Sequence, residues 1–124
     1  MFNTKVYICA LLVSVLTGCV SAPPPLYNWG TYPQQNYLMF VTPEKATATT
    51  QITKLEAEVE KSKATGLAVP PGLYAHLGLL YLQTQNAQKA ASYFELERQT
   101  YPESTILMDR LLQKNTNNTG KTSL

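Results

Sequence analysis

Few residues in this sequence are of types that could carry out acid–base, nucleophilic or metal chemistry. His76 is the single histidine, and its apolar neighbours place it on the surface of a predicted helix. Glu56, Glu58 and Glu60 alternate along another predicted helix, so they do not form a single pair, and we expect them on a solvated face. No glycine-rich phosphate loop, serine elbow or metal-ligand cluster occurs. These residues predict a protein that is not an enzyme and that binds no cofactor or metal.

The composition also bears on the kind of partner. The chain has 124 residues, enough for one domain, and a formal net charge of +2 with 15% charged residues. A balance this close to zero provides no basic stripe for phosphates and no acidic field to steer a ligand. Nucleic acid is therefore not expected as a partner.

The residue with the clearest chemistry is Cys19, because of what precedes it. Residues 1–18 contain a lysine followed by a short apolar run, which is the layout of a secretory signal and is too short to span a bilayer. Leu16-Thr17-Gly18-Cys19 resembles the bacterial lipobox, in which the cysteine thiol is diacylated before cleavage just ahead of it. The resemblance implies lipid attachment at Cys19 and loss of Cys9. A buried or reactive cysteine that follows an apolar run by chance is the alternative.

The residues after Cys19 indicate where such a lipoprotein would lie. Two acyl chains are enough for stable membrane anchoring. In Gram-negative lipoproteins an aspartate after the cysteine typically signals retention in the inner membrane. Val20 stands at that position, so the resemblance implies the periplasmic face of the outer membrane. Residues 19–26 form a proline-rich tether that reaches only on the order of 20 Å, so the domain is expected close to the bilayer.

Helical periodicity organises the rest of the chain. Between residues 47 and 63, Ile52, Leu55 and Val59 recur at helical spacing among polar residues, and Gly66 follows as a helix stop. Two further amphipathic stretches and a shorter one follow before residue 114. No alternating pattern of useful length, typical of a strand, occurs.

The bounds of the domain follow from the same pattern. The aromatic segment that begins at Tyr27 is too apolar for a linker, and Pro33 could open a helix that runs to about Thr42. Beyond Lys114 the residues are polar and cannot contribute to a core. The sequence therefore predicts an all-α domain over residues 27–114 and a disordered tail over residues 115–124.

Residues 71–104 match the roughly 34-residue tetratricopeptide pattern of two antiparallel helices. The matching positions are Tyr74, Leu77, Gly78, Tyr81, Ala90, Phe94 and Pro102. Glu97 departs from the pattern, which has a small alanine there, so we expect this side chain to face water or a third helix. An ordinary helical hairpin is the alternative. One repeat cannot bury its faces alone, so the neighbouring helices are expected to cover it.

The tetratricopeptide resemblance also implies a partner surface on the inner face of the first helix of the repeat. The corresponding positions here are Ala75, His76, Leu79, Leu82 and Gln83. Leu79 and Leu82 are apolar, so either the preceding helix buries them or they line a groove for a partner.

Tyr27 and Trp29 form a second candidate surface, because they follow the tether directly. Aromatic rings at such positions are typical of interfaces with protein or lipid head groups, and also of ordinary core packing. Both alternatives stay open at this point.

The chain from residue 26 to residue 114 resembles a family of small, uncharacterised Gram-negative lipoproteins with a tetratricopeptide-like domain. The resemblance rests on Trp29-Gly30-x-Tyr32, Pro70 to Ala75, Tyr101 to Ser104 and Met108 to Leu112. Members are often encoded beside a lipoprotein similar to the curli secretion channel component, which implies an envelope assembly or trafficking complex.

We therefore expect a non-enzymatic adaptor or assembly factor, with other envelope lipoproteins or secretion proteins as partners. A pilotin-like chaperone of a secretion subunit is one alternative. A cell-wall or lipid-modifying enzyme, or its activator, is another, which convergent carboxylates or a His76 dyad would favour.

Overall fold

The computed structural model describes residues 22–122, so the predicted signal peptide (1–18) and Cys19 lie outside the described residues. Within them the helices are α2 (Tyr32–Val41), α3 (Ala48–Thr65), α4 (Leu73–Gln83), α5 (Ala87–Thr100) and α6 (Thr105–Thr122), with short 3-10 turns η1 (Pro43–Lys45) and η2 (Pro102–Ser104). No β-strand occurs in this part of the chain, and the prediction of an all-α fold is confirmed.

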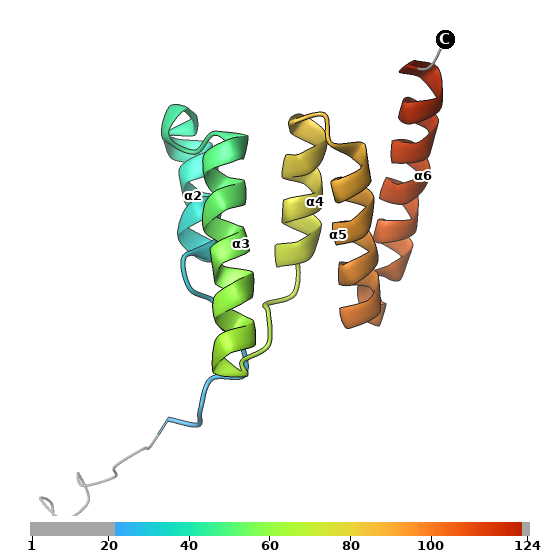
Figure 1. Ribbon diagram of the computed structural model, residues 1–124. Helices are drawn as coiled ribbons and strands as arrows, with labels where there is room; N and C mark the ends of the chain where they lie inside the picture. The colour runs from blue at the N-terminus through green and yellow to red at the C-terminus, as the bar shows by residue number, and fades with distance from the viewer. Residues whose placement is uncertain (1–21, 123–124) are drawn as a thin grey trace, which may run out of the picture.

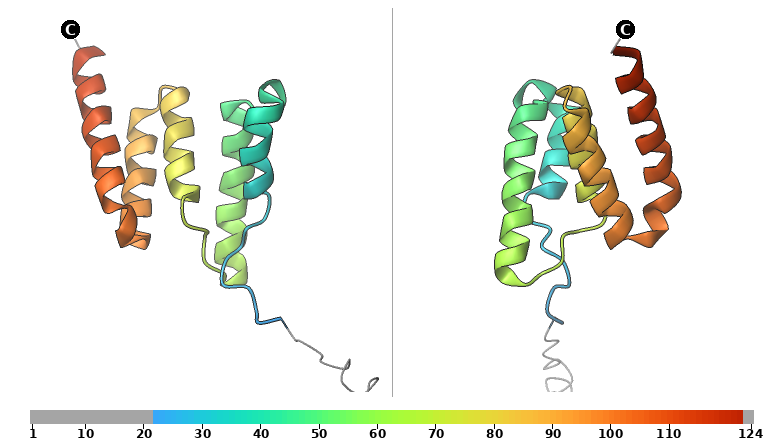
Figure 2. Two further views of the ribbon diagram at one scale, coloured as in Figure 1. Left: turned by 180° about the vertical axis from the view of Figure 1, so that it is seen from behind. Right: turned by 45° about the vertical axis from the view of Figure 1, so that its right-hand side comes forward.

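The helices form an antiparallel array in which neighbours run in opposite directions (Figure 1). Helices α2 and α3 lie at one end of the array and α6 lies at the other, with α4 and α5 between them. Figure 2 shows the same order from behind, with α2 now in front of α3. The core runs through the middle of the array and contains Leu55 of α3, Leu73 and Leu77 of α4, Phe94 of α5 and Met108 of α6.

Local signals explain the bounds of α3. Thr47 is the residue before the helix, and its hydroxyl accepts a hydrogen bond from the Thr50 N–H at 3.3 Å. Gly66 ends the helix in the left-handed conformation with φ 68°, which glycine adopts without steric cost. The predicted helix at 47–63 is therefore present. Ile52, Leu55 and Val59 are buried, as the spacing predicts.

The hairpin of α4 and α5 has the crossing that the tetratricopeptide pattern predicts. Gly78 and Ala90 are both buried, and a Cβ atom added at Gly78 would lie 2.4 Å from Cε1 of Phe94. Asn86 begins α5, and its side chain accepts a hydrogen bond from the Lys89 N–H at 3.1 Å. The two helices approach closely because Gly78 leaves room for the Phe94 ring.

A short pairing fixes the point where the N-terminal segment enters the domain. The Asn28 N–H donates to the Ala68 carbonyl at 2.9 Å, and the Ala68 N–H donates to the Leu26 carbonyl at 3.2 Å. Ala68 lies in the linker between α3 and α4, so the chain enters beside the C-terminal end of α3 (Figure 1).

The expectation that Glu97 faces water or a third helix is wrong. Glu97 is only 1% exposed, and its carboxylate accepts hydrogen bonds from the N–H groups of Gly72 at 2.7 Å and Ala75 at 3.3 Å. These N–H groups lie at the start of α4, where a helix has unpaired donors and a positive dipole end. Gly72 precedes the helix and has no side chain to cap it, so Glu97 supplies the acceptor from α5.

Glu58 is a second correction, because it does not lie on a solvated face. It is buried, and its carboxylate accepts hydrogen bonds from the Thr31 N–H at 3.0 Å and the Asn28 side-chain amide at 3.3 Å. Gly30 makes room for this carboxylate, since a Cβ atom there would lie 2.0 Å from Oε2 of Glu58. A glutamate of α3 thus accepts a backbone hydrogen bond at the start of α2, just as a glutamate of α5 does at the start of α4.

The predicted disordered tail at 115–124 is also not what the structure shows over the described residues. Helix α6 continues to Thr122, and Asn115 is buried. The Asn115 side-chain amide donates to the Ala87 carbonyl at 2.8 Å, which ties this turn of α6 to the start of α5. A polar composition does not reveal a long-range contact of this kind.

Candidate functional site

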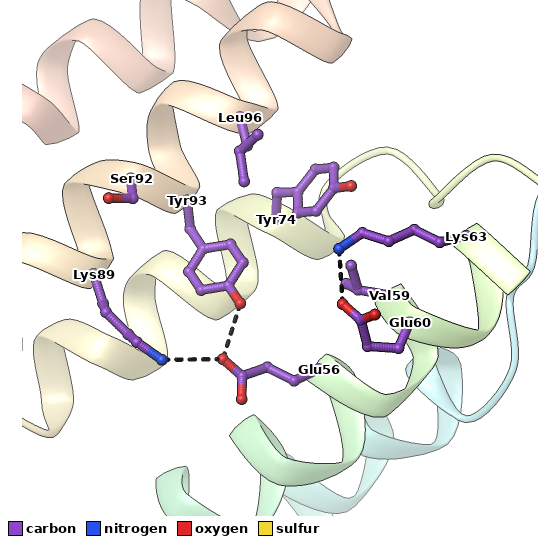
Figure 3. Close-up of a pocket in the computed structure, with 9 residues that line it drawn as sticks. All are labelled: Glu56, Val59, Glu60, Lys63, Tyr74, Lys89, Ser92, Tyr93 and Leu96. Carbon is purple, nitrogen blue, oxygen red and sulfur yellow. Dashed lines mark hydrogen bonds and ion pairs between the residues drawn. The ribbon is translucent and has the colours of Figure 1, made fainter.

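A groove opens between α3 and α5, with α4 contributing to its floor (Figure 3). Its volume is about 550 Å³, and it is lined by Glu56, Val59, Glu60, Lys63, Tyr74, Lys89, Ser92, Tyr93 and Leu96. We call it the α3–α5 groove. On each wall the lining residues follow the spacing i, i+3, i+4, i+7, so each helix turns one continuous stripe toward the groove.

One end of the groove is polar and organised around Glu56 (Figure 3). The Glu56 carboxylate accepts hydrogen bonds from the hydroxyls of Tyr81 at 2.6 Å and Tyr93 at 2.9 Å. Nζ of Lys89 lies 3.6 Å from the same carboxylate and 4.9 Å from the centroid of the Tyr81 ring. Glu56 therefore joins α3, α4 and α5, and the expectation of a simply solvated face is wrong here too.

The charge state of this end follows from the same contacts. Partial burial alone would raise the pKa of the Glu56 carboxyl, but the hydrogen bonds from Tyr81 and Tyr93 and the positive charge of Lys89 outweigh it. The pKa of Glu56 is therefore below its usual value, and the group is ionised at neutral pH. Burial and the nearby carboxylate raise the pKa of Tyr93, so its hydroxyl stays protonated and donates.

The floor of the groove is aromatic. The rings of Tyr81 and Tyr93 stack with centroids 5.5 Å apart, and those of Tyr74 and Tyr93 stack at 6.3 Å. Val59 is buried beside them, and Leu96 closes the apolar end while remaining 41% exposed. Rings of this kind present a large apolar area with little side-chain entropy to lose on binding.

Glu60 and Lys63 form the rim of the apolar end. They make an ion pair of 2.7 Å within α3, and their side chains are 71% and 65% exposed. Exposed pairs of this kind contribute little to stability, so these two side chains can rearrange when a partner arrives. An aromatic floor with an exposed charged rim is suited to binding.

The described residues hold no group of three or more His, Cys, Asp or Glu side chains that could bind a metal ion. None of the helices in residues 22–122 is long and apolar enough to cross a bilayer.

His76 does not lie on the helix surface as the sequence predicted. It is half-buried, its Nε2 lies 3.0 Å from the Gln51 side-chain oxygen, and its ring contacts Tyr32 edge-on at 5.9 Å. Burial lowers the pKa of His76, so the neutral imidazole is favoured. His76 therefore packs α2 and α3 against α4, and its described contacts include no acid that would complete a dyad.

The other positions of the predicted inner face differ in burial. Leu82 and Ala75 are half-buried against the core, as expected if neighbouring helices cover them. Leu79 is 42% exposed and Gln83 is exposed. The structure therefore does not gather these side chains into one surface.

Tyr27 and Trp29 have different environments. Tyr27 is half-buried and contacts Trp29 edge-on at 6.0 Å. Trp29 stacks on Tyr32 at 6.4 Å but stays 47% exposed. Tyr27 thus belongs partly to the packed interior, while one face of Trp29 remains available at the entry of the chain.

None of the predicted partner-binding residues lines the α3–α5 groove. The tetratricopeptide pattern directs attention to the inner face of the first helix, whereas the groove lies between the second helices of successive pairs. The signal that could have found it is the matching spacing of residues 56–63 and 89–96 on two helices that run in the same direction (Figure 1).

These features define a small, all-α helical-array protein with an aromatic groove on one face. A family model described as "Domain of unknown function (DUF4810)" matches residues 26–111, and the chain belongs to this family. The sequence resemblance to an uncharacterised family is confirmed at this level. Comparison with the curated proteins and with the solved structures gave no match.

Proposed function

We propose that this protein is a lipid-anchored, non-enzymatic adaptor at the periplasmic face of the outer membrane, which holds a helical segment of a protein partner in the α3–α5 groove. The observation that carries the proposal is the pair of stripes, each at i, i+3, i+4, i+7, on either side of an aromatic floor. Two such stripes form a trough into which one face of a third helix can pack, as in helix-in-groove recognition.

The character of the lining supports a protein partner. Tyr74, Tyr93 and Leu96 offer apolar contact area, and tyrosine is among the residues that dominate binding energy at interfaces. Glu60 and Lys63 stand at the edge, where exposed charges set orientation and specificity more than affinity.

The anchoring part of the proposal rests on the lipobox-like Leu16-Thr17-Gly18-Cys19 and on Val20. Leu26 and Asn28 pair with Ala68 beside the C-terminal end of α3, and the proposed tether directly precedes them. Since the tether is short, this end of the array would face the membrane, and the α3–α5 groove would run roughly along the membrane normal.

Cys19→Ser is expected to abolish lipid attachment, because a serine oxygen does not replace the acylated thiol. Labelled palmitate should be incorporated into the wild-type chain and not into the variant, and the variant should be recovered uncleaved or outside the membrane fraction. Equal labelling of the two chains would disprove anchoring at Cys19.

Leu96→Asp is expected to reduce capture of the partner by at least about tenfold, because a carboxylate would stand on the apolar end of the groove. The measurement is a pulldown with the lipidated protein from detergent-solubilised envelopes, with captured proteins quantified by mass spectrometry. Leu96 is 41% exposed, so the substitution should leave the melting temperature nearly unchanged.

Leu79→Asp is the matched control. Leu79 is 42% exposed and lies on α4 outside the groove, on the face that the tetratricopeptide resemblance implies for binding. The proposal requires Leu79→Asp to capture as wild type does. Loss of capture in Leu79→Asp with normal capture in Leu96→Asp would move the site to the inner face and reject the groove.

A further inference from the structure

We infer that the helix held in the α3–α5 groove is α2 of a second copy of this chain, so that the protein assembles head to tail. The inference deepens the proposed function and rests on the groove being a helix-binding site. Its starting point is the outward face of α2, which exposes three large apolar side chains.

The outward face of α2 carries Tyr37, Phe40 and Val41, which are 63%, 80% and 53% exposed. Phe40 and Val41 follow Tyr37 at three and four residues, so the three side chains form one stripe. Tyr32 and Gln35, on the opposite side, are the buried residues of the helix. Large apolar side chains that are exposed side by side on a small domain are typical of an interaction site.

The stripe and the groove complement each other in polarity. The apolar side chains of the stripe can pack on the rings of Tyr74 and Tyr93 at the floor of the groove. Both surfaces would then bury apolar area. The groove itself has two carboxylates, Glu56 and Glu60, balanced by two lysines, Lys63 and Lys89. The Lys63 and Lys89 side chains are 65% and 55% exposed, so either can also contact an acidic group of a partner.

Glu44 supplies that acidic group and sets the direction of the docked helix. It follows α2 in the turn η1, seven residues after Tyr37, and is exposed. If the docked α2 runs antiparallel to α3 and α5, Tyr37 lies at the apolar end near Leu96 and Glu44 lies near Lys89. The Lys89 side chain is 55% exposed, and its ion pair with Glu56 is long at 3.6 Å. Lys89 can therefore exchange its contact with Glu56 for one with Glu44.

The same direction suits two copies anchored in one membrane. Within one chain α2 already runs antiparallel to α3 and α5 (Figures 1 and 2). A second copy docked antiparallel therefore has its own tether at the same end of the array as the first. A parallel docking would place Glu44 near Lys63 instead and would point the two tethers in opposite directions.

The contact is heterologous, because the stripe and the groove consist of different residues, so association can continue from copy to copy. The groove spans only about two helical turns, so the contact is smaller than a standard interface and is expected to be weak in solution. Tethering in a membrane raises the effective concentration and favours it.

The test uses the mature chain with Cys19→Ala, studied by analytical ultracentrifugation at concentrations up to about 1 mM, the range of a weak contact. The weight-average mass of the wild-type chain should rise at least twofold over this range. Phe40→Asp places a charge on the stripe, and Leu96→Asp places one at the apolar end of the groove. Each variant should therefore remain monomeric. Leu79→Asp should associate as wild type does, and melting curves confirm that all variants are folded.

The decisive sample is an equal mixture of Phe40→Asp and Leu96→Asp. The first keeps a working groove and the second keeps a working stripe, so the mixture should form a dimer and nothing larger. A wild-type chain that stays monomeric, or association that persists in Leu96→Asp alone, would overturn the inference. A monomeric wild-type chain whose envelope capture still depends on Leu96 would overturn it while leaving the proposed function in place.

Discussion

Replacing Gly78 with leucine is expected to lower the free energy of unfolding by about 3 kcal/mol or more, at the upper end of overpacking effects. The first added atom, Cβ, would lie 2.4 Å from Cε1 of the Phe94 ring, and that ring is fully buried. Neither partner can move away without separating α4 from α5. Thermal or urea unfolding of the purified domain would measure the loss, with a fall in melting temperature of about 10 °C or more.

Gln83→Leu on the same helix provides the control for that measurement. Gln83 is exposed, so a leucine there adds the same side chain without crowding, and stability should change by less than about 0.5 kcal/mol. If Gly78→Leu melted like Gln83→Leu, the close crossing of α4 and α5 would be wrong.

Glu97→Ala is expected to cost about 2–4 kcal/mol, because it combines a lost charge-assisted hydrogen bond with a cavity. The N–H groups of Gly72 and Ala75 would lose their acceptor in a buried site. The Ser104 hydroxyl, 3.4 Å from the same carboxylate, would lose its contact as well. Urea unfolding followed by far-UV circular dichroism is the appropriate measurement.

Glu95→Ala is the matched control for Glu97→Ala. Glu95 lies two residues away on the same helix and makes an ion pair with Arg98 at the surface, with side chains about one-third exposed. Removing a surface pair of this kind should cost less than about 1 kcal/mol. Equal losses in the two variants would show that Glu97 does not hold the start of α4.

The two buried glutamates reveal how the array is constructed. Glu58 of α3 bonds the backbone at the start of α2, and Glu97 of α5 bonds the backbone at the start of α4. In each case a glycine with positive φ, Gly30 or Gly72, precedes the helix. The same device therefore recurs in two successive helical pairs, which supports reading them as two related units of one array.

This arrangement also determines which charged side chains line the α3–α5 groove. Since Glu58 and Glu97 are directed toward α2 and α4, the groove is left to Glu56, Glu60 and the side chains opposite them. Glu56 and Glu58 are only two residues apart on α3, yet one faces the groove and the other faces the interior.

Much of the fold could be predicted because the signals are local. Thr47 and Gly66 bound α3, Asn86 begins α5, and Pro33 opens α2, each within one helical turn of the backbone it affects. The spacing that brings Gly78 against Phe94 is likewise a property of two helices joined by a tight turn. Short-range hydrogen bonds and helical periodicity can be predicted from a sequence, because the residues involved lie within a few positions of each other.

Only the tertiary structure determined which charged residues are buried and where the groove lies. Glu58 meets Asn28 across 30 residues, Glu97 meets Gly72 across 25, and Asn115 meets Ala87 across 28. A glutamate on an amphipathic helix is ordinarily solvated, so its sequence neighbours predict a surface position. Whether it is instead buried depends on unpaired N–H groups that another helix brings to it, and that is a property of the packed array.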